Sequence, residues 1–184
     1  SGIMCLFTAA LLLGGTDVNG QLKLAALRYR QGQDYWTGPL ANFTASTDYD
    51  NCHKYDKHFI STLDEVSQFK AWFEAGENDQ QNGTSTQNEL FPNYQIPSII
   101  KEWPAHGDVS LGQDYYLAPF FDKNEDGHYK WEDGDYPWYD IDKSKECKVD
   151  RRISLYGDMN LWWVMNDKGN IHTETQGEPI GMEI

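Results

Sequence analysis

A run of twelve residues, from Asp122 to Asp133, most constrains what this chain of 184 residues can fold into. Oxygen-bearing side chains recur at every second position at its start, from Asp122, Asn124 and Asp126, and Asp133 closes the run. These are positions 1, 3, 5 and 12 of a calcium-binding loop. A hard divalent cation needs six to eight oxygen ligands, and a tight loop with this spacing can supply most of them. We therefore predict a Ca²⁺ site over residues 122–133.

The remaining loop positions and the flanks indicate the type of site. Gly127 fits position 6, where the loop turns sharply, and His128 offers its backbone carbonyl at position 7. Asp135, just beyond the loop, is a candidate outer ligand. Pro119 before the loop and Pro137 after it disfavour the two helices of an EF-hand. We predict a structural calcium clip rather than a calcium sensor, the alternative being an acidic turn that holds only water.

The net charge supports bound cations and disfavours two classes of partner. The formal charge is −14, so both the phosphates of nucleic acid and anionic membrane surfaces would repel the chain. Between Asp108 and Asp142 there are ten acidic side chains and two lysines. Bound cations would relieve this repulsion. We expect no nucleic-acid partner and no direct membrane insertion.

Composition and patterning favour a mainly β fold with long loops. Aromatic residues are abundant, at 7 Trp, 11 Tyr and 8 Phe, as is typical of β-rich proteins. The apolar run 3–13, the turn 14–20 and the segment 21–29 predict a β-hairpin. Residues 161–165 predict a strand, followed by a turn over 166–170. We predict one β-sandwich-like extracellular module over residues 1–184, as an incomplete domain or a fragment of a longer protein.

One α-helix is clearly indicated, over about residues 62–75. Thr62 and Glu65 have the spacing of a capping box, in which each side chain binds the backbone N–H of the other residue. Gly76 can end the helix in the left-handed conformation. An apolar face continues along the helix through Val66, Phe69 and Phe73. Residues 76–89 have no apolar period and predict a mobile surface loop.

The three cysteines and the apolar N-terminal run bear on location. Cys52 and Cys147 have polar neighbours, whereas Cys5 lies within the apolar run, so we predict a Cys52–Cys147 disulfide. Three reduced thiols in a cytosolic protein are the alternative. The apolar run is too short to cross a bilayer, and we favour a buried strand there over a remnant of a targeting signal. A disulfide and a calcium clip together predict a secreted or cell-surface protein.

The sequence assigns no catalytic residue. Glycoside hydrolysis needs two carboxylates at a fixed separation, and candidates are Glu102, Asp108, Asp114, Glu132 and Asp135. Such pairs arise easily in an acidic chain, so catalysis stays an open alternative. The histidines have no zinc-site spacing, and no nucleophile elbow, P-loop or dinucleotide fingerprint is present. Aromatic faces that could stack on sugar rings are those of Trp103, Trp162 and Trp163, although packing in the core is the stronger interpretation.

Several short blocks, taken together and in order, resemble a known group of proteins. These blocks are residues 14–22, 34–40, 103–107, the calcium loop continuing through 134–137, and 161–167. They resemble a recurring region of large secreted surface proteins of bacteria that use the type IX secretion system. This resemblance implies secretion and a role in adhesion or surface motility, and it supplies no catalytic residues. No sorting domain or leader is found within these residues.

The sequence thus predicts a calcium-stabilised structural or adhesive module of a secreted bacterial protein. Its expected partners are other modules of the same protein or surface assembly, and glycans are a further candidate. One alternative is a carbohydrate-binding module or a glycoside hydrolase. Another is a subunit of an extracellular filament, since the last residues have the pattern of a strand that could pair with a neighbouring edge.

Overall fold

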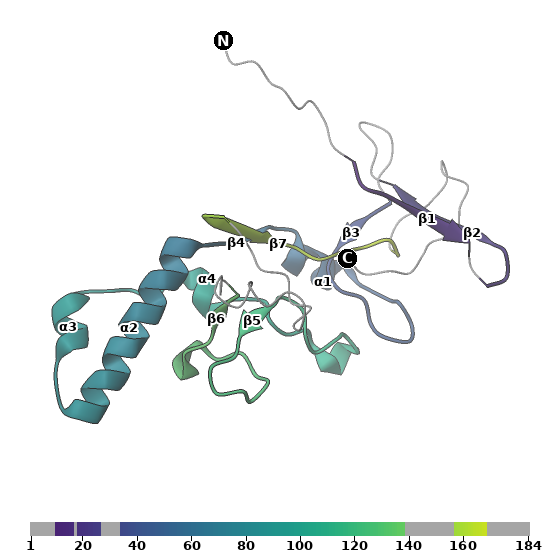
Figure 1. Ribbon diagram of the computed structural model, residues 1–184. Coiled ribbons are helices and arrows are strands. Elements are labelled where there is room, and N and C mark those ends of the chain that lie inside the picture. Colours follow the sequence, from purple (N-terminus) through teal and green to yellow (C-terminus); the bar gives the residue numbers. More distant parts are fainter. Residues whose placement is uncertain (1–9, 17, 27–33, 139–156, 169–184) are drawn as a thin grey trace, which may run out of the picture. The chain divides into compact units, whose positions relative to one another are not determined.

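The protein divides into two compact units, each described here by itself. The computed structural model describes residues 10–16, 18–26, 34–138 and 157–168 (Figure 1). The first unit comprises residues 1–57, 108–115 and 163–184, and the second comprises 58–107 and 116–162. Helices and two-stranded antiparallel sheets both contribute to the described residues. The fold is therefore mixed α/β in this part of the chain, and the expectation of a mainly β fold with one helix is corrected.

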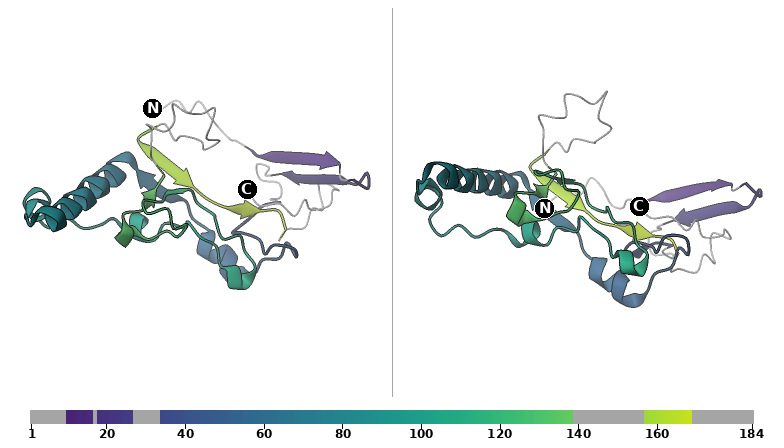
Figure 2. Two further views of the ribbon diagram at one scale, coloured as in Figure 1. Left: turned by 60° about the horizontal axis from the view of Figure 1, so that its bottom comes forward. Right: turned by 90° about the horizontal axis from the view of Figure 1, so that it is seen from below.

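In the first unit, the predicted β-hairpin is confirmed, but its first strand, expected to be buried, is mostly exposed, with Leu12 66% exposed. Strands β1 (Leu12–Thr16) and β2 (Leu22–Ala26) pair antiparallel, with Leu12 opposite Ala26 and Thr16 opposite Leu22 (Figures 1 and 2). The predicted turn over 14–20 is too long, because residues 14–16 belong to β1. Gly14 suits that strand because a Cβ there would lie 2.7 Å from Leu24 Cδ2.

A buried asparagine ties together the rest of the first unit. Helix α1 (Tyr49–Tyr55) begins after Asp48, whose side chain accepts the N–H of Asn51. The Asn51 side chain donates to Pro39 O at 2.8 Å and accepts from Gln113 Nε2 at 2.8 Å. Gln113 follows the short 3₁₀ helix η1 (Val109–Leu111), so three distant segments meet at Asn51. A satisfied buried amide of this kind fixes chain positions with little apolar surface.

Strand pairing in both units joins residues far apart in the sequence. In the first unit, β3 (Trp36–Thr37) pairs with β8 (Met165–Asn166). In the second, β4 (Phe59–Thr62) pairs with β7 (Met159–Trp162), with Phe59 opposite Trp162. The predicted strand over 161–165 is thus two strands, and Asn166, predicted to start a turn, is paired in β8. The remainder of that predicted turn, from residue 169, lies outside the described residues.

The core of the second unit lies between helix α2 (Leu63–Asn82) and the segments that follow it. Its buried members are Val66, Phe69, Ile100 and Tyr136. Ile100 lies in the short helix α4 (Ser98–Lys101), and Tyr136 lies in strand β6 (Tyr136–Pro137), which pairs with β5 (Phe120–Phe121). The β5–β6 pair is thereby anchored to α2 through Tyr136.

The start of α2 confirms the predicted capping box. The Thr62 hydroxyl accepts the N–H of Glu65 at 3.2 Å, and the Glu65 carboxylate accepts the N–H of Thr62 at 2.9 Å. Val66 and Phe69 are buried, and Phe73 packs against the same core. The 3.6-residue period of the sequence therefore located this helix and its buried face correctly.

The end of α2 corrects two predictions. The helix continues through Gly76 to Asn82, and Gly83 is its left-handed C-cap, with φ 69°. Residues 76–89 are therefore not a loop, because helix α3 (Thr86–Leu90) follows directly and lies beside α2 (Figure 1). The Asp79 carboxylate holds α3 by accepting the N–H groups of Thr86 and Gln87 at 2.8 and 2.7 Å.

Two predictions about location fall mostly outside the described residues. Cys52 lies in α1, with its Sγ 3.7 Å from Thr47 Oγ1, but Cys5 and Cys147 are not among the described residues. The Cys52–Cys147 disulfide therefore stays a prediction. Among the residues that the structure describes, no helix is both long enough and apolar enough to cross a membrane.

The capping box yields a first prediction. Thr62→Ala removes the acceptor for the Glu65 N–H, so we expect the free energy of unfolding to fall by about 1 kcal/mol. Ser85→Ala is the matched control, because Ser85 precedes α3 without a side-chain capping bond and should cost less than about 0.5 kcal/mol. Urea denaturation of both variants measures the difference. Equal losses would contradict the capping role.

Candidate metal centre

The predicted calcium loop connects the two strands of a β ribbon. Phe120 and Phe121 of β5 lead into it, and the 3₁₀ helix η2 (Trp131–Asp133) leads out toward β6. Phe121 lies opposite Tyr136, so the ribbon brings the two ends of the loop together. The predicted absence of flanking EF-hand helices is confirmed for these described residues. In an EF-hand, two packed helices hold the ends of the loop together. Here the paired strands β5 and β6 do so.

Side chains at the first three ligand positions fold the loop back on its own backbone. Asp122 Oδ2 accepts the N–H of Gly127 at 2.7 Å, and Asn124 Oδ1 accepts that of Asp126 at 3.1 Å. Asp126 Oδ1 accepts the N–H of His128 at 2.7 Å, and this bond is the main reason that the pKa of Asp126 lies below its usual range. Side-chain oxygens at positions 1, 3 and 5 are thus turned toward the inside of one turn.

Two residues adopt the left-handed backbone conformation that so tight a turn requires. Gly127 has φ 79° and Glu125 has φ 60°. Glycine adopts this conformation without steric cost, whereas glutamate does so at a cost. The assignment of Gly127 as the turn-making glycine is confirmed by this backbone conformation.

Position 12 faces positions 3 and 5 across the loop. Asp133 Oδ2 lies 3.4 Å from Asn124 Nδ2 and 3.5 Å from Lys130 Nζ. The same ammonium lies 3.3 Å from Asp126 Oδ2. These two carboxylates raise the pKa of Lys130, with Asp126 contributing most. The loop therefore already holds one positive charge between two of its predicted ligands.

Asp135 has a different place from the one predicted. Its side chain is fully buried, and its two oxygens accept the N–H groups of Lys123 and Lys130, each at 2.9 Å. Burial raises the pKa of this carboxyl, with Asp122 and Asp126 adding to the effect and the two N–H donors opposing it. Asp135 fastens both arms of the loop from beneath, which is a positioning role that the sequence did not reveal.

A histidine outside the loop supports it from one side. His106 Nε2 accepts the N–H of Tyr129 at 2.7 Å, and the Tyr129 hydroxyl donates to Ile100 O. Burial is the main cause that raises the pKa of Tyr129. The His106 ring also packs against Phe120 at the loop entrance. The sequence gave no sign that His106 belongs to the loop.

The donor set has the chemistry that calcium prefers, but its side chains would have to rearrange to bind an ion. Carboxylate, amide and backbone oxygens are hard ligands, which suit Ca²⁺ far better than zinc. Within the described ranges, no three His, Cys, Asp or Glu side chains are arranged to hold a metal ion. The predicted set counts three acidic side chains, together with the Asn124 amide and the His128 carbonyl. Several of their oxygens now bind backbone N–H groups or Lys130, so a metal would compete with these partners.

The other candidate residues are dispersed. Asp108 and Asp114 belong to the first unit, where Asp108 caps η1 and Asp114 accepts from Asn42 Nδ2 at 2.7 Å. Glu102 and Glu132 belong to the second unit and are exposed. In each unit, these candidate carboxylates are exposed and have only capping, hydrogen-bond or solvent contacts.

The candidate sugar-stacking tryptophans differ in exposure. Trp103 is 5% exposed, donates to Pro119 O, and packs on Trp162, which in turn contacts Phe59 edge-on. Trp163 belongs to the first unit and is 47% exposed. Packing therefore accounts for Trp103 and Trp162, and Trp163 is the most exposed of the three.

Comparison of the chain with known protein families, with curated proteins and with solved structures finds no match.

The exit of the loop yields a prediction that tests its packing. Gly134 has φ 95°, and a Cβ there would lie 2.7 Å from both Lys123 Cδ and Phe73 Cε1. Gly83 has φ 69° with nothing within 4 Å of the same point. Gly83→Ala should cost about 1 kcal/mol for the left-handed backbone, and Gly134→Ala about 1–3 kcal/mol more for overpacking. Chemical denaturation of the pair measures this difference. Equal costs would show that Phe73 does not pack tightly on the loop exit.

Proposed function

We propose that this chain is a calcium-stabilised structural or adhesive module of a secreted or cell-surface bacterial protein. The calcium loop would act as a permanent clip, closing the β5–β6 ribbon of the second unit. Asp122, Asn124, Asp126 and Asp133 would bind the ion through side chains, and His128 through its carbonyl. The expected partners are further modules of the same surface protein or assembly.

The observation that carries this proposal is the side-chain arrangement of residues 122–133. Three predicted ligand side chains lie on one tight turn, which has left-handed backbone at Glu125 and Gly127, and Asp133 lies across the loop from Asn124. The Lys130 ammonium between Asp126 and Asp133 indicates a strongly negative local field. A divalent ion in the same place would neutralise more charge and add coordination bonds.

The extracellular location and adhesive role rest on other support. The in-order blocks that resemble type IX secretion surface proteins imply export, and extracellular calcium is high enough to fill a weak clip. A β-sandwich-like arrangement of the complete module belongs to the same proposal. It is supported by β3–β8 and β4–β7, which pair strands distant in the sequence.

Thermal unfolding in Ca²⁺ and in EDTA tests the clip. Ca²⁺ at about 100 times its Kd should stabilise the native state by about 2.7 kcal/mol. For a chain of this length, that corresponds to a rise in Tm of about 5–10 °C. Mg²⁺ at the same concentration should give a smaller rise, because the loop offers no ready octahedral cage.

Two charge-matched variants make the melt specific to the proposed ligands. Asp126→Asn and Glu125→Gln each remove one negative charge at adjacent positions, but only Asp126 is a proposed ligand. Asp126→Asn keeps an oxygen for the His128 N–H but exchanges a carboxylate ligand for a weaker amide ligand, so it should lose part of the Ca²⁺-dependent rise in Tm. Glu125→Gln should keep it. An equal loss in both variants, or no rise in the parent chain, would contradict the clip.

Protease treatment of intact cells tests the proposed location. If the chain lies on the surface of the bacterium that produces it, external protease should remove its immunoblot signal while a cytosolic protein in the same cells survives. EDTA should accelerate the cleavage, since loss of the clip raises the population of open states. Protection of the chain until the cells are lysed would overturn the surface assignment.

A further inference from the structure

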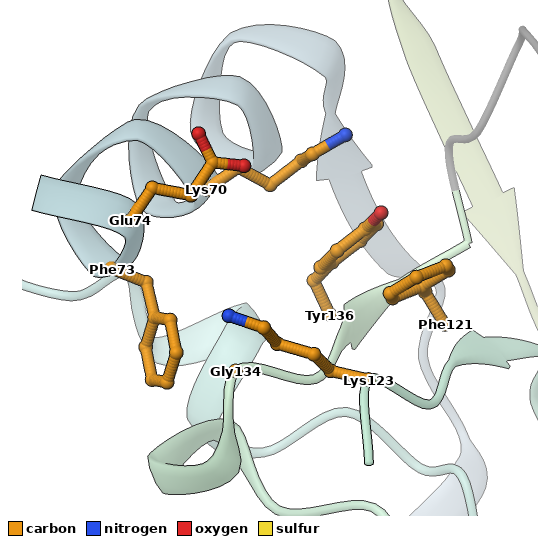
Figure 3. A pocket seen from close by; sticks show the side chains of 7 residues that line it. All are labelled: Lys70, Phe73, Glu74, Phe121, Lys123, Gly134 and Tyr136. Atoms are coloured by element: carbon orange, nitrogen blue, oxygen red, sulfur yellow. The ribbon is translucent and has the colours of Figure 1, made fainter. Parts of the chain in front are cut away.

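A small cavity beside the calcium loop has an unusual charge for this chain. Its volume is about 260 Å³, and it is an open pocket between α2 and the β5–β6 ribbon (Figure 3). It is lined by Lys70, Phe73, Glu74, Phe121, Lys123, Gly134 and Tyr136. Two of its three charged side chains are lysines, although acidic residues outnumber basic ones by 29 to 15 in the whole chain. Glu74 lines the same cavity and Glu77 pairs with Lys123, so Lys70 is the cationic group left for a ligand.

The two lysines differ in whether their ammonium group already forms an ion pair. Lys123 forms an ion pair with Glu77, and its Nζ lies 4.4 Å from the centroid of the Phe73 ring. Lys70 has no ion pair with any described residue, and its Nζ lies 5.0 Å from the Tyr136 ring centroid. Both ammonium groups thus lie over aromatic faces at the edge of one cavity (Figure 3). Lys70 retains the capacity to bind an anion.

Apart from Glu74, the remaining walls are apolar. Tyr136 is buried and stacks on Phe121 with ring centroids 4.8 Å apart. Gly134 lets the Phe73 ring and the Lys123 side chain approach the backbone more closely than any side chain would permit. An apolar wall with a few fixed polar groups is the usual composition of a small-molecule site. The volume lies just below the common range of such sites, so the occupant is small.

We propose that this cavity binds a small carboxylate carried on a six-membered ring, such as a uronic acid. The ring would take the place of the two ammonium groups over Phe73 and Tyr136, and its carboxylate would bind the displaced Lys70 ammonium, with Lys123 contributing from the opposite side. Charge-assisted hydrogen bonds of this kind give both affinity and orientation. Glu74, on the same helix face as Lys70, opposes the anion and weakens the site. The proposal does not depend on calcium binding by the loop.

NMR titration of the isotope-labelled full chain in calcium buffer tests the proposal. The probes are galacturonate and benzoate, and neutral galactose is the control. At about 10 mM, a ligand with a Kd of about 1 mM fills most sites. We expect either carboxylate to shift the amide signals of Lys123, Gly134 and Tyr136, and galactose to leave them unchanged. A response to galacturonate indicates an acidic sugar, and a response to benzoate alone indicates an aromatic acid. Failure of both, or an equal response to galactose, overturns the proposal.

Three variants separate a specific site from general attraction of anions. Lys70→Gln should weaken binding roughly tenfold, the usual effect of removing one charge-assisted bond. Glu74→Gln should tighten it, because the opposing carboxylate is gone. Lys101→Gln is the matched control, since Lys101 also lies over an aromatic ring, 5.6 Å from the Trp131 centroid, but does not line the cavity. Equal weakening by Lys70→Gln and Lys101→Gln would refute the site. Unchanged melting curves would show that each variant is folded.

Discussion

The loop between β5 and β6 depends on the buried carboxylate of Asp135. A buried anion without partners would cost several kcal/mol, so its two oxygens must be satisfied by donors that cannot move away. Those donors are the backbone N–H groups of Lys123 and Lys130. One side chain therefore fixes both arms of the calcium loop relative to β6. The two arms of the loop are held in place without an ion, although the side chains of residues 122–133 would have to rearrange to bind one.

The same ribbon positions the loop and the cavity, because its residues alternate between two environments. Asp135 faces the loop, whereas its neighbours Gly134 and Tyr136 line the cavity beside α2. Lys123 joins the two sites: its backbone N–H binds Asp135, and its side chain reaches Phe73 and Glu77 on α2. A change in the loop backbone at Lys123 would thus also move a side chain that lines the cavity.

Local patterns were predictable from sequence, and contacts between distant segments were not. The capping box and the turn at Gly127 depend on neighbours within a few residues, so spacing alone revealed them. Gly76 was wrongly predicted to end the helix. A glycine is needed there because of a tertiary contact, since a Cβ would lie 2.5 Å from Gln87 Nε2. The helical content of residues 76–89 depends likewise on Asp79 and Gln87. His106 and Asp135 support the loop through tertiary contacts, which the periodicity of the sequence does not predict.

The electrostatics of the loop explain why a cation would matter to stability. Burial raises the pKa of Asp135, so its ionised form is disfavoured in the folded state. This contribution lowers stability as pH rises above the pKa of the unfolded chain and through the folded pKa. Asp122 and Asp126 add to the effect, and the Lys130 ammonium balances only part of their charge. A divalent cation bound to the loop would favour the ionised carboxylates. At neutral pH it would therefore offset the loss of stability that burial of the ionised Asp135 causes.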